Sequence, residues 1–336
     1  MDALSDVLRA VRLTGAIFFD IHASEPWVAE TPAGRLIVSK IFSDAEHLIP
    51  FHVVTQGSCW GSVLDEPPVH LSAGDIIVFP HGDAHTMSSA PGMRGTPDLA
   101  LYRRPSDGQL PFSMSMGHTQ LDPSHIVCGY LGCDARPFNP LLNALPRVIH
   151  VSDRAGGAIG AFVQFAIAEA KERRPGGEVV LGRLSELMFV DVVRRYLETL
   201  APDRTSWLAA LREPFVGRAL TALHRSPARA WTLELLAHEV GLSRSALVER
   251  FTEFVGHPPM QYLSNWRMQL AANHLLAGTD SVAEIAERVG YESDAAFSRA
   301  FKKAVGKAPS EWRKTRGVAA AVPQAAPAES PSPSRH

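Results

Sequence analysis

The spacing of hydrophobic residues repeats one helical unit twice between residues 231 and 316. In each copy, four apolar side chains recur at the i, i+3, i+4 and i+7 positions that line one face of a helix. A turn follows, and then a second apolar stripe. The two copies are Leu233, Leu236, Ala237, Val240, Gly241, Leu247, Phe251 and Val255, and then Val282, Ile285, Ala286, Val289, Gly290, Phe297, Phe301 and Val305. Each unit is therefore predicted to be a helix, a tight turn and a second helix.

Capping residues indicate where the second helix of each unit begins and ends. We call these two second helices the probe helices. Ser243 and Ser293 stand at their starts, where a serine side chain accepts a free backbone N–H of the first turn. Gly256 and Gly306 stand at their ends, where glycine adopts the left-handed backbone that closes a helix.

One long helix is predicted between the two units, at residues 260–277. With a rise of about 1.5 Å per residue, it spans about 27 Å. It holds the probe helices roughly one DNA turn, about 34 Å, apart. Both probe helices can then enter successive major grooves on one face of a duplex.

The sequence of these units resembles the DNA-binding domain of the AraC/XylS family of bacterial transcription regulators. The resemblance rests on residues 256–268, 289–293 and 297–302 and covers about a hundred residues, 214–316. A single helix-turn-helix is a weak signal, whereas two in register, joined by a helix, are specific. The alternative is a helical bundle with a chance repeat.

The outward, N-terminal positions of the probe helices are expected to read base edges. They are Arg244, Ser245, Val248, Glu249, Asp294, Ala295, Ser298 and Arg299. The resemblance implies that Arg299 contacts a guanine, whereas Glu249 either accepts from a cytosine or orients Arg250. Phosphate contacts are expected from Arg267, Lys302, Lys303, Lys307 and Arg313. The alternative for each residue is a solvated helix face.

The pattern in the N-terminal half changes from helical to strand-like. Residues 2–13 have a helical spacing, and short β-rich runs separated by Gly and Pro follow. These runs are 16–21, 36–42, 51–55, 76–79 and 125–131. Many short strands separated by turns predict an antiparallel barrel or sandwich.

Residues 74–85 resemble the second signature motif of the cupin superfamily, with Gly74, Pro80, Gly82 and His85 in the expected order. The family pattern has Asn where Ser89 stands. The first motif, with two His and a Glu, is poorly kept, and His47 and His52 are its nearby remnants. These departures argue against a metal-dependent cupin enzyme.

Residues 51–60 and 128–130 resemble the cupin-type sensor domain of one branch of AraC-like regulators. Strand alternation would bring His52, His85 and Cys128 together inside the barrel. Imidazole and thiolate are ligands that Zn²⁺ prefers, so an effector site or a zinc or other divalent metal site is one interpretation. The other interpretation is packed core residues with hydrogen-bonded imidazoles. Thiol sensing by Cys128 and Cys133 is weighed against two inert buried thiols.

Two amphipathic stripes follow, at residues 159–170 and 181–196, with a break at 175–177. They predict an antiparallel helical hairpin. The family resemblance implies that this hairpin makes the contact of a homodimer. The alternative is that the hairpin packs only on its own barrel.

Charge and composition fit a two-part molecule. Residues 215–316 hold 14 Lys and Arg and 10 Asp and Glu, a net charge of +4, and the remainder carries −6. A basic half attracts DNA phosphates. Three cysteines do not suggest a disulfide framework. Without a signal-peptide pattern or an apolar run of about 20 residues, the chain is expected to be cytoplasmic and to have no membrane contact.

The sequence therefore predicts an α+β multidomain regulator and not an enzyme. The expected parts are a cupin-like antiparallel β-barrel sensor (1–150), a helical hairpin (151–200), a linker (201–213), an all-α tandem helix-turn-helix domain (214–316) and a disordered tail (317–336). Expected partners are double-stranded DNA, a small-molecule effector, RNA polymerase and a second copy of the chain. The alternative function is a metal-dependent cupin enzyme fused to a DNA-binding domain.

Overall fold

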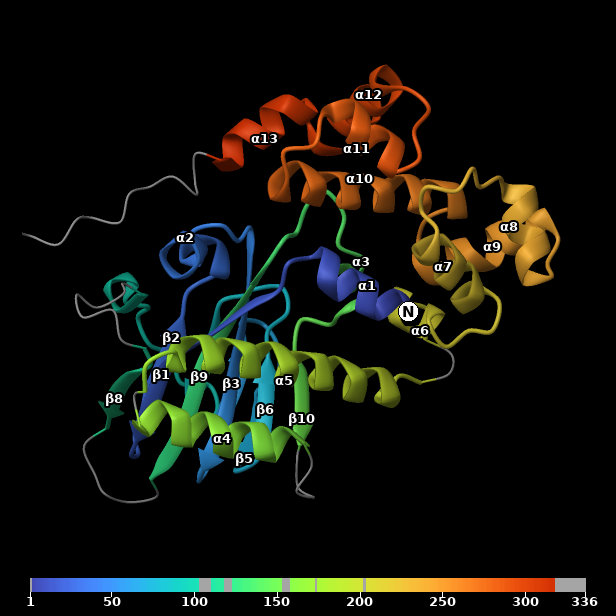
Figure 1. The fold of residues 1–336 in the computed structure, drawn as a ribbon. Helices are drawn as coiled ribbons and strands as arrows, with labels where there is room; N and C mark the ends of the chain where they lie inside the picture. Colours follow the sequence, from blue (N-terminus) through green and yellow to red (C-terminus); the bar gives the residue numbers. More distant parts are fainter. Residues whose placement is uncertain are drawn as a thin grey trace, which may run out of the picture.

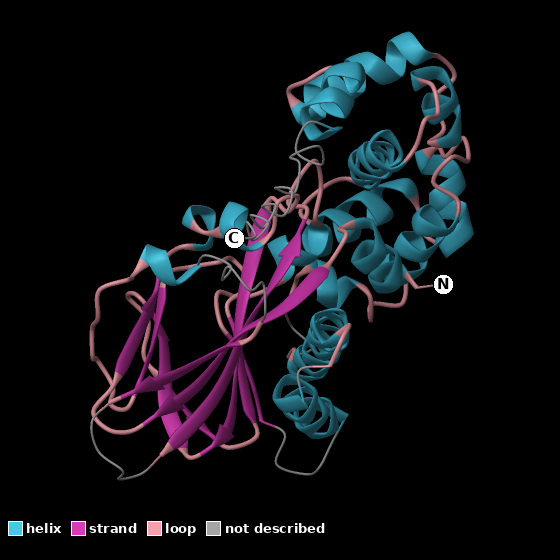
Figure 2. Ribbon diagram, turned by 60° about the vertical axis from the view of Figure 1, so that its left-hand side comes forward, coloured by secondary structure: helices cyan, strands magenta, loops and turns pink. Residues whose placement is uncertain are grey.

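A computed structural model describes residues 2–102, 110–117, 123–152, 158–172, 174–201 and 204–317. Figure 1 shows a β-rich N-terminal half and a helical C-terminal half, and Figure 2 shows the same division from another side. The predicted disordered tail lies outside the described residues from 318 onward. Among the described helices, none has the length and apolar composition needed to cross a lipid bilayer.

The strands of the N-terminal half form two sheets. The six-stranded sheet has the order β10-β6-β3-β9-β1-β8, and the four-stranded sheet has the order β2-β7-β4-β5. All pairs are antiparallel except β1 with β8. The strands are β1 (Thr14–Ala23), β2 (Val28–Thr31), β3 (His47–Gln56), β4 (Ser58–Val63), β5 (Val69–Ser72), β6 (Asp75–Val78), β7 (His85–Ser88), β8 (Phe112–Met116), β9 (Ser124–Cys133) and β10 (Ile149–Ser152).

Four of the five predicted strands are confirmed, and they lie in β1, β3, β6 and β9. The strand predicted at residues 36–42 is wrong. This segment forms the short helices η1 (Gly34–Leu36) and α2 (Val38–Ile41). Its two most buried residues, Ile37 and Ile41, are four positions apart, as on a helix face, and Leu36 is exposed. A short apolar run does not distinguish the two periods.

The six-stranded sheet carries apolar side chains on both faces. Its inner face packs against the four-stranded sheet through side chains such as Phe19, Ile126 and Tyr130. Its outer face carries Ile17 and Val127, among others, and is covered by α4 (Ala158–Glu172) and α5 (Gly177–Thr199). The predicted helical hairpin therefore exists, and it packs on the sheet.

Two glycines allow α5 to approach β1 closely. A Cβ added at Gly182 would lie 2.6 Å from the carbonyl oxygen of Gly15, and one added at Gly15 would lie 2.4 Å from the carbonyl oxygen of Gly182. The backbone N–H of Gly15 also donates to Glu186 of α5 over 3.2 Å. Only glycine fits this contact without displacing the helix.

The C-terminal half contains both predicted helix-turn-helix units. Its helices are α6 (Trp207–Ala210), α7 (Val216–Arg225), α8 (Leu233–Val240), α9 (Arg244–Val255), α10 (Pro259–Ala277), α11 (Val282–Arg288), α12 (Asp294–Val305) and α13 (Pro309–Gly317). The probe helices are α9 and α12. Ser243 and Ser293 cap them, and Gly256 and Gly306 end them with φ of 78° and 82°. The long connecting helix is α10, as predicted.

The two units belong to different hydrophobic clusters, and α10 contributes to both. The first unit packs Phe251 with Tyr262 and Trp266 from the N-terminal half of α10. The second unit packs Phe297 with Ala271, from the C-terminal half of α10. The probe helices are therefore fixed to opposite ends of one rigid element.

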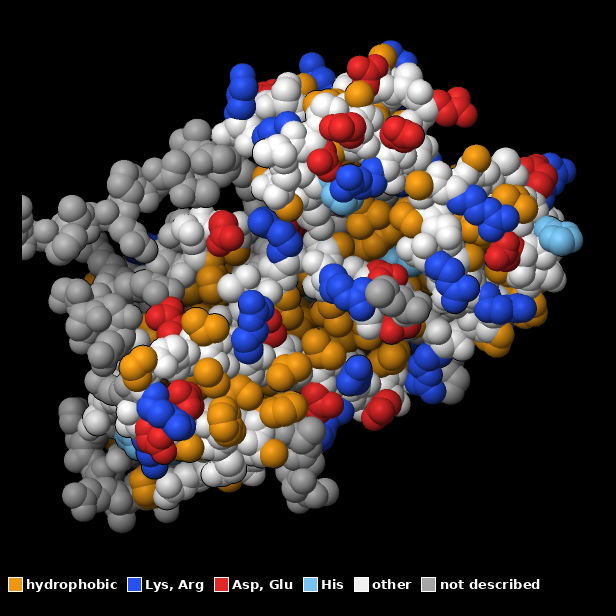
Figure 3. All heavy atoms as spheres, in the orientation of Figure 1, with side chains coloured by type: hydrophobic (Ala, Val, Ile, Leu, Met, Phe, Trp, Pro, Cys, Tyr) orange, Lys and Arg blue, Asp and Glu red, His pale blue; other side chains and the backbone are white. Residues whose placement is uncertain are grey.

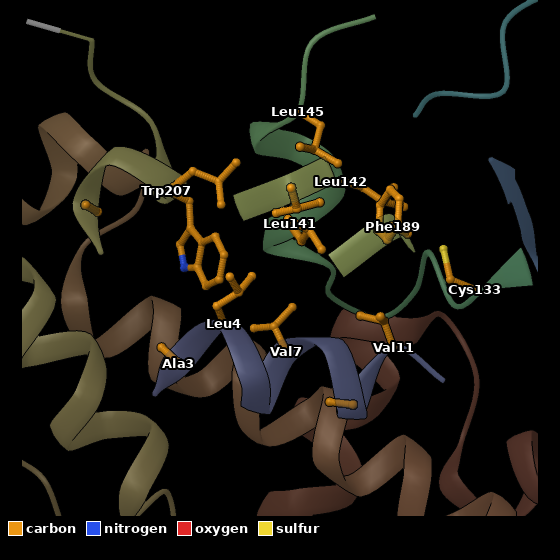
Figure 4. Packing of buried hydrophobic residues seen from close by; sticks show 14 of the residues in the cluster. Ala3, Leu4, Val7, Val11, Cys133, Leu141, Leu142, Leu145, Phe189 and Trp207 are labelled. Atoms are coloured by element: carbon orange, nitrogen blue, oxygen red, sulfur yellow. The ribbon is translucent and has the colours of Figure 1, made fainter. Parts of the chain in front are cut away.

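The two halves of the molecule share one core at their junction. Helices α1 (Ala3–Ala10), α3 (Pro140–Ala144) and α6 pack together with the first helix-turn-helix unit (Figure 4). The segment 201–213 was expected to be a linker. Within its described part, Trp207, Leu208 and Ala210 are buried, and the indole N–H of Trp207 donates to the hydroxyl of Tyr262 over 2.9 Å.

Polar contacts also connect the halves at α10. The backbone N–H of Phe138 donates to Oε1 of Gln269 over 3.0 Å, and Nε2 of Gln269 donates to the carbonyl of Ala10 over 3.0 Å. Asn273 donates to the same carbonyl over 2.7 Å. The helix that spaces the probe helices therefore contacts the sensor half directly.

Candidate DNA interface and sensor cavity

The first probe helix, α9, presents the predicted base-reading residues to solvent. Leu247 and Phe251 are fully buried, so the opposite side of the helix faces outward. Ser245 and Glu249 are exposed on that side, Val248 is half-buried, and Arg244 is exposed in the first turn of the helix. Arg244 forms an exposed ion pair with Glu234 at 2.7 Å.

Glu249 does not orient Arg250, and that alternative is wrong. The guanidinium of Arg250 donates to Glu213 over 2.9 Å and lies over the ring of Phe215. Arg250 therefore holds α9 on the start of α7. Glu249 remains exposed on the outer side of the probe helix.

The second probe helix, α12, is arranged in the same way. Phe297 and Phe301 are buried in the core of the second unit. Asp294, Ala295 and Arg299 are exposed, and Ser298 is half-buried. Six of the eight predicted base-reading residues are thus exposed, and Val248 and Ser298 are half-buried.

The predicted phosphate contacts divide into two groups. Lys302, Lys303 and Lys307 are exposed at the end of α12. Arg267 instead donates to the carbonyls of Pro227 and Arg229 over 2.8 and 2.9 Å, and burial lowers its pKa. Arg313 likewise donates to the carbonyl of Asp280. These two arginines hold loops in place. Their positive charge in the sequence did not indicate this role.

A cavity of about 130 Å³ lies on the inner face of the six-stranded sheet. Its lining is mainly apolar and aromatic, with Trp27, Tyr102, Met114 and Ile126 among the contributors. His52 and Cys128, which are directly opposite each other on β3 and β9, also line it. Two of the three predicted sensor residues therefore lie on one cavity wall.

His52 and His85 form a buried imidazole pair. Their Nε2 atoms are 2.8 Å apart, and Nδ1 of His85 donates to the carbonyl of Asp83 over 2.9 Å. Nε2 of a neutral His85 is then an acceptor, so Nε2 of His52 is the donor. Nδ1 of His52 becomes a buried acceptor that has no partner among the described residues.

Burial keeps both imidazoles neutral near pH 7. Burial lowers the pKa of His85 to about 4 and lowers the pKa of His52 well below its ordinary value. His85 is also stacked on Phe79, with ring centroids 3.9 Å apart. The stacking on Phe79 and the hydrogen bond to His52 therefore fix the His85 ring beside His52.

The predicted metal set does not assemble. The ligand atoms of His52, His85 and Cys128 do not all lie within 4.8 Å of one another in the described structure. The hydrogen bond between the two imidazoles also uses the lone pair that a metal would need. Hydrogen-bonded core imidazoles, the alternative reading, describe His52 and His85.

The cysteines are buried and unbridged. Burial raises the pKa of Cys59 to about 12 and the pKa of Cys128 well above its ordinary value. Cys128 belongs to the core between the sheets, whereas Cys133 belongs to the core on the other face. A bridge between Cys128 and Cys133 would have to cross the sheet, and protonated buried thiols are poor nucleophiles.

Sequence reasoning missed one polar cluster, made by Asp20 and His22 of β1 and His125 of β9. It lies outside the cavity, and the pairing of His22 with His125 across the strands creates it. The alternation of side chains along a strand shows only which face each residue lies on. The pairing register of β1 with β9 brings the three residues together, and the sequence pattern does not determine that register.

Comparison with known proteins identifies the family. A putative AraC-like transcription regulator from Streptomyces lividans is 32% identical over 318 residues, which are 94% of this chain and 98% of that protein. The chain belongs to the AraC-like transcription regulators. Residues 2–198 match a cupin family, and residues 236–315 match a helix-turn-helix domain family.

Other relatives match 94% of this chain. AlkR of Acinetobacter baylyi, an HTH-type transcriptional regulator, is 28% identical over 94% of this chain and 99% of that protein. RclR of Escherichia coli, an RCS-specific HTH-type transcriptional activator, is 25% identical over 94% of this chain and 98% of that protein. This chain is accordingly a DNA-binding transcription regulator with an N-terminal cupin domain.

Proposed function

We propose that this regulator reads an operator with α9 and α12 and that a small effector in the cupin cavity controls that reading. The observation that carries the proposal is the exposure of six of the eight predicted base-reading residues on two helices attached to opposite ends of α10. Two such helices on one spacer suit successive major grooves of one duplex.

Each probe helix has a distinct role in this proposal. Arg299 donates two hydrogen bonds to a guanine, and Glu249 accepts from a cytosine amino group. Arg244 reaches a base after it leaves Glu234, an exchange of low cost because the ion pair is exposed. Lys302, Lys303 and Lys307 contact phosphates, and Arg267 and Arg313 hold the loops beside the same surface.

The effector is proposed to be small and largely apolar, with one hydrogen-bond donor. Aromatic and aliphatic side chains dominate the cavity wall, so apolar surface supplies most of the binding energy. Nδ1 of His52 is the acceptor, because it is buried without a partner among the described residues. Satisfying that atom gives the effector its orientation.

The route from the cavity to the DNA-binding half runs along β9. Cys128 and Tyr130 of β9 line the cavity, and the chain that follows carries Phe138, whose N–H contacts Gln269 of α10. An effector that favours one position of β9 thus alters the seating of α10. It can do so only through different affinities for the two arrangements.

The helical hairpin is proposed to make a homodimer. Phe165, Val179 and Leu187 are 51%, 67% and 52% exposed on α4 and α5, and Figure 3 shows hydrophobic side chains gathered on this surface. Exposed apolar groups on helices that already pack on a sheet favour a second partner. RNA polymerase is the further partner that the family implies, and the cytoplasm is the expected compartment.

No catalytic role is proposed for the cupin domain, because the imidazole pair leaves no open metal position between His52 and His85. Turnover by metal-loaded protein with candidate substrates would contradict this point. The 74–85 motif is likewise given no catalytic role, because its His85 is hydrogen-bonded to His52 in the core.

The test of the proposal starts with selection of operators from random DNA by the full chain, followed by binding assays at fixed salt. A defined operator is expected, with at least a thousandfold preference over unrelated DNA. Candidate effectors are then titrated against operator binding. Equal binding to all DNA sequences would overturn the proposal that α9 and α12 read an operator. An operator affinity that does not change when an effector occupies the cavity would overturn the proposal that the effector regulates DNA binding.

A further inference from the structure

The cluster of Asp20, His22 and His125 lies on the outer face of the six-stranded sheet. His22 and His125 are directly opposite each other on β1 and β9. Asp20 is two residues from His22 and therefore points to the same face. One ligand atom from each of the three side chains lies within 4.8 Å of the other two.

We infer that Asp20, His22 and His125 bind a divalent transition-metal ion, with Zn²⁺ as the best fit. Two imidazoles and one carboxylate are a ligand set that zinc accepts, with a water molecule in the fourth position. The site is separate from the effector cavity, which lies on the opposite face of the same strands.

The hydrogen bonds of His125 prepare it as a ligand. The hydroxyl of Thr55 donates to the backbone carbonyl of His125 over 3.0 Å, so its oxygen accepts from Nδ1 of the same residue over 2.6 Å. A proton on Nδ1 leaves the lone pair of a neutral imidazole on Nε2. This is the second-shell arrangement that fixes the tautomer of a metal-binding histidine.

His125 and Asp20 face each other at a distance that suits a shared ion. Nε2 of His125 lies 2.5 Å from Oδ1 of Asp20. With the proton of the neutral ring on Nδ1, both facing atoms are acceptors, and a metal ion placed between them would bind to both. If Nε2 instead carries a proton, that proton makes a hydrogen bond to Asp20, and a metal ion can replace it.

His22 completes the set. Its ring is stacked on the ring of His125, with centroids 4.3 Å apart, and its Nε2 lies 3.9 Å from Oδ2 of Asp20. Ligand atoms at about 2.1 Å from one zinc ion lie roughly 3.4 Å apart, so small rotations suffice. The His22 side chain is 60% exposed, which permits the rotation and leaves the open position accessible to water.

The donor set also excludes the common hard cations. Mg²⁺ and Ca²⁺ prefer oxygen ligands, and this cluster offers two nitrogens and one carboxylate. The ion would link β1 to β9, whose opposite faces line the effector cavity with Phe19 and Cys128. Metal binding would therefore restrain the strands that the effector contacts.

The test uses tag-free full-length protein that has been stripped with a chelator and dialysed against Zn²⁺. About one zinc ion per chain is expected at saturation, and excess Mg²⁺ should not displace it. His22→Ala should weaken zinc binding at least tenfold without loss of folding, because the side chain is exposed. Thr55→Val, which removes the support of His125, should weaken it by about tenfold or more.

The matched control is His150→Ala. His150, whose side chain is 31% exposed, pairs with the buried Asp75, with Nε2 and Oδ2 3.2 Å apart, and neither belongs to a three-ligand cluster in the described structure. The control should bind zinc as the natural sequence does. Wild-type protein that binds no zinc, or a His22→Ala protein with unchanged affinity, would overturn the inference. Circular dichroism of each variant separates loss of ligand from loss of fold.

Discussion

Arg299 and Glu249 occupy the sixth residue of the two probe helices and carry opposite charges. Both are exposed. If each contacts a base, the two half-sites differ in sequence, because arginine pairs with guanine and glutamate with cytosine. The two units are alike in fold and would then differ in specificity, and single substitutions can separate their contributions.

Arg299→Ala is expected to weaken operator binding by about 1 to 3 kcal/mol and to relax the preference at one base pair. Binding to the selected operator and to its single-base variants measures both effects. Arg225→Ala is the control, because Arg225 is an exposed arginine of α7 in the same half. An unchanged base preference in Arg299→Ala would remove this residue from the reading set.

His224 predicts a pH dependence of stability. It is buried, and the Tyr262 hydroxyl, which accepts from Trp207, donates to its Nε2 over 2.8 Å. Burial lowers its pKa to about 3, from 6.5 in the unfolded chain. The unfolded state therefore binds more protons below pH 6.5, and stability falls as the pH decreases until it levels off near pH 3.

Between pH 7 and pH 5, His224 alone should reduce the free energy of unfolding by about 2 kcal/mol. Urea denaturation at the two pH values measures this change. His224→Gln keeps an acceptor for Tyr262 but does not titrate, so its pH dependence should be smaller by that amount. An equal pH dependence in the variant would show that His224 is not the group responsible.

At the scale of elements, the sequence predicted the helices that belong to the repeat and those that have recognisable capping residues. The helices of both units, their caps at Ser243 and Ser293 and the long α10 follow from spacing and local hydrogen bonding alone. The segment 36–42 failed because a short apolar run fits either a strand or a helix. Strand pairing could not be predicted from the sequence either, since the register of β1 with β9 is set by packing of the whole sheet.

The packing of the hairpin on the sheet depends on Gly182. Gly182→Ala places a Cβ 2.6 Å from a backbone oxygen of β1, so α5 must shift. We expect a loss of about 1 to 3 kcal/mol in the free energy of unfolding. Arg194→Ala, at an exposed position of the same helix, should change it by less than about 0.5 kcal/mol. A Gly182→Ala protein that is as stable as the natural sequence would mean that α5 and β1 are not in tight contact at this position.

At the scale of the molecule, the sensor and DNA-binding halves are packed into each other. Gln269 of α10 contacts Ala10 and Phe138, and these residues are 259 and 131 positions away in the sequence. No local pattern indicates such a contact, so the sequence predicted a linker at 201–213, part of which lies in the shared core. The burial pattern of α9 and α12 was predictable because it depends on helix phase, whereas the base-reading role of their exposed residues stays a prediction.

The central claim is that two probe helices on one spacer read one duplex. Methylation interference on the selected operator tests it most directly, because it reports contacts with guanine N7 in the major groove. The predicted result is interference in two successive major grooves on one face of the DNA, about 10 base pairs apart for each bound chain. Interference in a single groove, or on opposite faces of the duplex, would contradict the account.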